Sequence, residues 1–166
     1  MTQNKKLAIF EGISGLCAIL DFAFCFLPAY FEEGKEDQSI FHMAGVKPVL
    51  WIGLILLLVA GIASLLLAFL LFKDKIDHKK TMVIAIVSGL SCLVAGILLS
   101  LSLFVCGYHK ANSELGFTQG VWGVKIGTIL VAIMSLASFV LSYPSALVVL
   151  HDLDMKDHEK KKEIAK

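Results

Sequence analysis

Two acidic side chains and one lysine lie within long apolar runs of the sequence, namely Asp21, Glu11 and Lys125. A carboxylate in hydrocarbon costs about 2.5–3.5 kcal/mol on insertion scales, so it must carry a proton, pair with a cation or reach water. We expect Asp21 to pair with Lys125 and to fix how two helices pack. A proton- or cation-coupled transport site and a water-exposed carboxylate are the alternatives for Asp21. Glu11 lies near Lys6, and we expect its long side chain to extend to the membrane interface.

Two Asp-His pairs of equal spacing follow apolar runs: Asp74 with His78, and Asp154 with His158. On a helix, each pair stands one turn apart on one face. Carboxylate and imidazole can bind a divalent metal, and two such pairs together would supply four ligands. Charged residues must also reappear where a helix leaves the bilayer, and a histidine there complements the negative helix terminus. We favour this second interpretation and keep the metal site as the alternative.

The chain lacks the motifs of the common enzyme classes. It has no phosphate-binding glycine loop, no HExxH helix and no nucleophile–base arrangement. Its residues are 57% hydrophobic and only 17% charged, which excludes an ordinary soluble enzyme. The formal net charge is +1, so no basic field exists to hold nucleic acid through its phosphates. We therefore expect a non-enzymatic protein without a cofactor and without a nucleic-acid partner.

Four apolar runs are long enough to position these residues in a membrane. A helix needs about 20 residues to cross a hydrocarbon core. The runs cover residues 7–30, 49–72, 81–108 and 121–150. The breaks between them carry Gly, Pro, Asn and charged residues. The sequence thus predicts an all-α integral membrane protein, an antiparallel bundle of four transmembrane helices in which Pro144 kinks or interrupts the fourth helix.

The distribution of lysines predicts the orientation of the bundle. Lysines gather before the first run, in the loop 73–80 and in the charged tail 151–166, while the other two loops hold few. By the positive-inside rule, both termini and the loop 73–80 are cytoplasmic. All of the basic residues are lysine and none is arginine, which is typical of an AT-rich genome, and we expect a bacterial plasma membrane. The topology resembles that of tetraspan proteins, but the predicted outward loops contain no cysteine, so nothing beyond topology carries over.

Small residues recur at four-residue spacing on three of the expected helices. These stripes are Ser88, Cys92, Gly96 and Ser100 in the third run, Ala60, Ser64 and Ala68 in the second, and Ser138, Ser142 and Ala146 in the fourth. Small residues let helices approach closely in lipid, where association depends on packing and hydrogen bonds. Either all the stripes are used inside the bundle, or at least one is left for a partner subunit or a second copy.

The two halves of the chain resemble each other at an offset of 74 residues. Ser14-Gly15-Leu16 aligns with Ser88-Gly89-Leu90, and Ala63-Ser64 aligns with Ala137-Ser138. A tandem duplication of a helical hairpin would explain the match, and so would chance similarity between apolar sequences. A parallel repeat of this kind occurs in some transporter halves.

The sequence favours a small polytopic membrane protein that acts as an accessory or scaffold subunit. It would work through contacts with lipid and with another membrane protein or copies of itself. The alternative is a small proton- or cation-coupled transporter or channel that uses Asp21.

Overall fold

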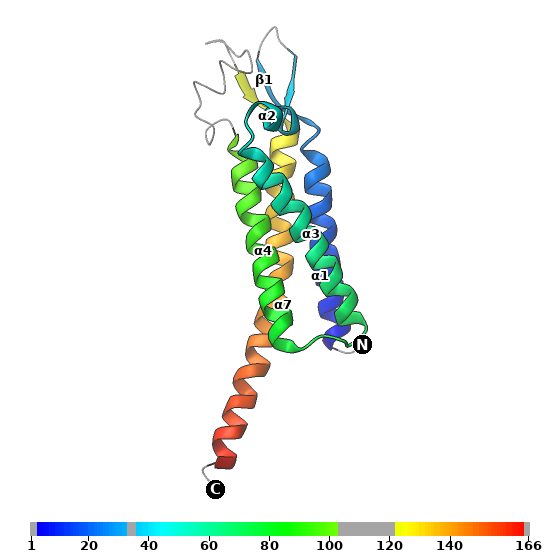
Figure 1. The fold of residues 1–166 in the computed structure, drawn as a ribbon, viewed down its shortest axis with the longest axis vertical. Helices are drawn as coiled ribbons and strands as arrows, with labels where there is room; N and C mark the ends of the chain where they lie inside the picture. Colours follow the sequence, from blue (N-terminus) through cyan, green and yellow to red (C-terminus); the bar gives the residue numbers. More distant parts are fainter. Residues whose placement is uncertain (1–2, 33–35, 103–121, 165–166) are drawn as a thin grey trace.

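A computed structural model describes residues 3–32, 36–102 and 122–164, and its main elements are four long helices (Figure 1). They are α1 (Gln3–Phe24), α3 (Leu50–Phe72), α4 (His78–Ser100) and α7 (Ile126–Ile164). All four are long and apolar enough to cross a membrane. In hydrocarbon every backbone amide must be bonded within the segment, which an α-helix achieves. The predicted antiparallel four-helix bundle is confirmed.

The helices form a ring of antiparallel neighbours. Helix α1 packs against α3 and α7, and α4 packs against the same two helices, so α1 and α4 lie on one diagonal. Apolar side chains such as Ile55, Val59 and Leu66 are exposed on the outside of the ring. Hydroxyl and carboxyl groups are buried inside it. This distribution suits a bundle surrounded by lipid.

One end of the bundle carries a small antiparallel sheet, which the sequence analysis did not predict. Strand β1 (Pro28–Glu32) lies between β2 (Gln38–Ser39) and β3 (Trp122–Val124). Tyr30 is paired with Val124, so the sheet joins the segment after α1 to the segment before α7. Figure 1 shows this sheet end of the bundle opposite the N-terminus, with α2 (Ile40–Val46) beside the sheet.

The predicted spans need two corrections at the sheet end. The first helix ends at Phe24 rather than at residue 30, because the chain turns there and Pro28 begins a strand. The fourth begins at Ile126, after β3. A short apolar strand that adjoins an apolar helix cannot be distinguished from it by hydropathy. The third predicted run, 81–108, extends into residues 103–121, which lie outside the described residues.

Of the two effects predicted for Pro144, a kink or an interruption of the fourth helix, the interruption is wrong. Helix α7 runs without a break from Ile126 to Ile164, with Pro144 inside it. Transmembrane helices tolerate an internal proline because the freed backbone group can be satisfied by neighbouring groups. Figure 1 shows the last part of α7 projecting beyond the ends of the other helices.

Candidate functional site

One face of α1 carries the two carboxyl groups into the bundle. Glu11, Ser14, Ala18 and Asp21 are all buried. Their spacing of three and four residues places them on one side of the helix. The expectation that Glu11 extends to the interface is therefore wrong: it lies on the inward face and is fully buried.

Asp21 is bound to a serine and not to a lysine. The Ser135 hydroxyl of α7 donates a hydrogen bond to Oδ2 of Asp21. The other carboxyl oxygen, Oδ1, has no hydrogen-bond partner among the described residues. The site is therefore a buried carboxyl group held by one neutral donor.

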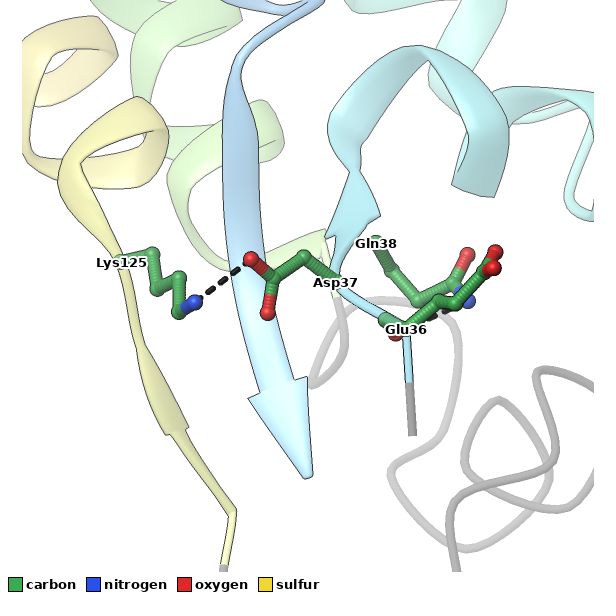
Figure 2. Close-up of polar contacts among 4 residues, drawn as sticks. All are labelled: Glu36, Asp37, Gln38 and Lys125. Atoms are coloured by element: carbon green, nitrogen blue, oxygen red, sulfur yellow. Dashed lines mark hydrogen bonds and ion pairs between the residues drawn. The ribbon is translucent and has the colours of Figure 1, made fainter. Parts of the chain in front are cut away.

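Lys125 lies too far towards the sheet end to reach Asp21. Its Nζ forms an ion pair of 2.5 Å with Asp37, and both side chains are partly exposed (Figure 2). Its backbone N–H donates to the Ala29 carbonyl at 2.7 Å. Ser135, which does reach Asp21, is ten residues further along the chain, or about 15 Å along a helix axis. The predicted Asp21–Lys125 link is wrong because Lys125 precedes α7 and belongs to the sheet end.

A serine network lies next to Asp21 on the same two helices. The Ser14 hydroxyl is 3.0 Å from the Ser138 hydroxyl and 2.8 Å from the Ser142 hydroxyl. Ser138 also donates to the Cys92 sulfur of α4 at 3.3 Å. Because a hydroxyl both donates and accepts, these groups can satisfy one another in either direction.

Glu11 occupies the other end of this network. The hydroxyls of Ser145 and Ser64 lie near its carboxyl group. Neither forms a hydrogen bond of standard geometry with it, and both Glu11 oxygens are without a partner in the described part of the chain. Ser64 instead donates to Ser88 of α4 at 3.1 Å. Glu11 is thus a second buried carboxyl group, with two hydroxyl groups near it.

The carboxyls and their serines share one antiparallel register. Glu11 and Asp21 are ten residues apart on α1, and Ser145 and Ser135 are ten residues apart on α7. Ser14 lies between the carboxyls and meets Ser142 and Ser138. We call these seven residues the polar ladder: Glu11, Ser14, Asp21, Ser135, Ser138, Ser142 and Ser145.

The small-residue stripes of the sequence pack inside the ring. Ser88, Cys92, Gly96, Ala60 and Ser64 are buried, whereas Ser100 and Ala68 are half-buried. A Cβ atom on Gly96 would overlap the Ser135 side chain, so this glycine makes room for the donor to Asp21. The stripes therefore serve the interior of this bundle.

Two serines of the ladder were missed by the sequence analysis, Ser135 and Ser145. The small-residue stripes of the sequence repeat every four residues, whereas the buried positions of α7 follow a heptad. Its members are Thr128, Val131, Ser135, Ser138, Ser142 and Ser145. A heptad is the pattern that antiparallel bundle packing favours, so a search at that period finds both serines.

The placement of Asp74 and His78 on one helix is wrong, because α3 ends at Phe72, Asp74 lies in the turn that follows, and His78 begins α4. The metal site itself stays a hypothesis. Asp74, at a φ of 51°, accepts a hydrogen bond of 2.7 Å from Asn4. The side chains of His78, Asp154 and His158 lie outside the described part of the structure. Within that part, no group of three or more His, Cys, Asp or Glu residues is placed to hold a metal ion.

Comparison with family models, with curated proteins and with solved structures finds no match to this chain. Function must therefore be argued from the site. Among the described groups, the polar ladder brings together carboxyls that can carry a proton and hydroxyls that can pass one on.

Proposed function

We propose that this non-enzymatic membrane protein binds protons at Asp21 and Glu11 and passes them along the polar ladder. The observation that carries the proposal is the full burial of both carboxyls, with no lysine or histidine against them in the described residues. A buried carboxylate without a cation costs several kcal/mol. A neutral, protonated carboxyl avoids that cost, and it is then a proton carrier within the bilayer.

The serines supply a route between the two carboxyls. Along a helix, Glu11 and Asp21 are separated by about 15 Å, a distance that a direct proton transfer cannot cross. Between them, the Ser14 hydroxyl lies at hydrogen-bond distance from the hydroxyls of Ser138 and Ser142. Each hydroxyl can accept a proton on one side and donate on the other.

A proton fits the site better than a metal cation. Hard cations such as Ca²⁺ take six to eight oxygen ligands. Asp21 has a single hydroxyl donor, Ser135, whose hydrogen points to the carboxyl. This hydrogen bond satisfies one oxygen of the carboxyl group. A metal cation would instead have to be bound by lone pairs of the surrounding oxygen atoms.

Proton flux into liposomes tests the proposal. The purified protein is reconstituted with a pH-sensitive dye inside, and an imposed pH gradient is followed for wild type, Asp21→Asn and Glu11→Gln. We expect wild-type flux well above that of empty liposomes and at least a tenfold loss in each variant. Asp74→Asn is the matched control, because Asp74 is exposed outside the ladder, and it should keep wild-type flux. Wild-type flux equal to that of empty liposomes would overturn the proposal.

An accessory or scaffold subunit is the second candidate, and the length of α7 favours it. This helix continues to Ile164 as a charged segment beyond the bundle, and such a segment is suited to a partner at the membrane surface. With the predicted orientation, it would lie in the cytoplasm of a bacterial cell. Affinity purification in mild detergent, with and without residues 151–166, tests this function. A stoichiometric membrane-protein partner lost with the tail would support it, and a tail-independent homo-oligomer would count against it.

We also propose that the bundle arose by duplication of a hairpin. The offset of 74 residues exchanges Ser14 with Ser88 and Ser138 with Ser64, and the hydrogen-bonded pairs are Ser14–Ser138 and Ser64–Ser88. The same offset relates Leu65, which packs at Gly15, to Phe139, which packs at Gly89.

The two carboxyls break this symmetry. The counterparts of Glu11 and Asp21 in the second half are Ala85 and Ala95, and both alanines are fully buried. A packing scaffold does not need the carboxyls at these positions, since alanine serves in the other half. The asymmetry therefore supports a role for Glu11 and Asp21 beyond packing.

A further inference from the structure

An apolar groove lies between α4 and α7, and Ser142 is the one member of the polar ladder among its lining residues. It has a volume of about 330 Å³. Its walls include Met82, Ile86 and Leu90 from α4 and Phe139, Tyr143 and Leu147 from α7. These residues fall within the apolar spans Lys79–Ser100 and Ile126–Val148, so the groove lies at the depth of the lipid chains.

Two residues, Lys79 and His151, continue the groove-lining faces of α4 and α7 beyond the end of the groove that is remote from the sheet. Lys79 precedes Met82 and Ile86 at spacings of three and seven residues, which places it on the same face of α4. His151 follows Leu147 by one turn of α7. Both residues are exposed, and they lie at or just beyond the ends of the apolar spans, where phosphate head groups are found.

We propose that this groove binds an anionic phospholipid. One acyl chain lies between Ile86 and Tyr143, and the phosphate is held by Lys79 and His151. The Lys79 ammonium group and an imidazole N–H of His151 complement a phosphate, and the apolar walls complement the chain. Basic pockets between helices on the cytoplasmic side are suited to anionic lipids. This inference is independent of proton transfer, because the groove can be occupied whether or not the ladder conducts.

Quenching of tryptophan fluorescence by brominated lipid tests the site. Tyr143→Trp places the probe in the groove, and Val87→Trp places it at a similar depth on the exposed surface of α4 outside the groove. Trp51 and Trp122 are replaced by Phe in both proteins. Vesicles contain either brominated phosphatidylglycerol or brominated phosphatidylcholine. We expect the groove probe to prefer phosphatidylglycerol on the order of fivefold, and the Val87→Trp probe to show no preference.

Removal of single charges distinguishes a site from general attraction to the membrane surface. Lys79→Gln in the Tyr143→Trp protein should abolish most of the preference. Lys75→Gln removes the same charge from the exposed loop before α4, and it should leave the preference unchanged. An equal effect of both substitutions, or equal quenching by the two lipids, would overturn the proposal. Weak quenching by both lipids would also overturn it, since a second copy of the chain would then cover the groove.

Discussion

The Ser135 hydroxyl of α7 donates a hydrogen bond to the Asp21 carboxyl of α1, although the two residues are 114 positions apart in the chain. The bond joins α1 and α7, the first and last helices of the ring. It also replaces the lysine pairing that the sequence suggested. The same hydrogen bond therefore links two helices and binds a buried carboxyl group.

Replacement of Ser135 by alanine should destabilise the bundle. The Ser135→Ala variant leaves the buried Asp21 carboxyl without its donor, and we expect the free energy of unfolding to fall by about 1 kcal/mol. Thermal unfolding in detergent, followed by circular dichroism, measures the change. Ser91→Ala, at a half-buried position of α4, is the control and should change little. If Ser135→Ala has no larger effect than Ser91→Ala, the bond does not stabilise the protein.

A methyl group at Gly96 of α4 should disturb the hydrogen bond between Ser135 and Asp21. The new Cβ overlaps the Ser135 side chain, so Gly96→Ala must push α4 and α7 apart and cost about 1–3 kcal/mol. Gly45→Ala on α2 is the matched control because nothing lies within 4 Å of its added Cβ atom. Helix propensity makes this control neutral or slightly stabilising. Equal unfolding temperatures for the two variants would contradict the close approach at Gly96.

Ser14 should contribute more to stability than Ser88, its counterpart in the other half. Its hydroxyl lies 2.8 Å from the Ser138 carbonyl oxygen and 2.8 Å from the Ser142 hydroxyl, so its loss removes contacts from α1 to two residues of α7. The Ser88 hydroxyl is bonded to Ser64 and to its own helix. Interhelical hydrogen bonds in membranes average about 0.6 kcal/mol and reach about 1.7 kcal/mol. We expect Ser14→Ala near the upper value and Ser88→Ala near the lower value in unfolding measurements. A larger loss for Ser88→Ala would contradict this order.

The Lys125–Asp37 ion pair should matter little to stability. Both side chains are more than a third exposed, and pairs of this kind contribute about 0–1 kcal/mol. Lys125→Gln and Asp37→Asn should each lower the unfolding temperature slightly, and the effect should vanish at high salt because exposed charges are screened. A double-mutant cycle measures the coupling. Loss of proton flux in Lys125→Gln would show that this lysine acts on the ladder after all.

The sequence by itself determined the helices. Hydropathy fixes four spans, because a segment of about 20 apolar residues has no better structure in lipid than a helix. It also singled out Asp21, because a carboxyl in such a segment is costly whatever surrounds it. The stripe that contains Gly96 and Cys92 was recognisable from spacing alone, since small residues one turn apart predict close packing.

Only the tertiary structure decided the partners of these residues. Asp21 could have met Lys125 or a hydroxyl, and the outcome depended on the axial position of α7 relative to α1, which no local pattern specifies. Glu11 was expected at the interface because its side chain is long enough to reach it, but the rotation of α1 turned it inward beside Ser145. The strands at the sheet end were missed for a similar reason. The pairing of β1 with β3 joins segments far apart in the sequence. It depends on the packing of α1 against α7, which brings the adjoining segments together, and not on the strand residues alone.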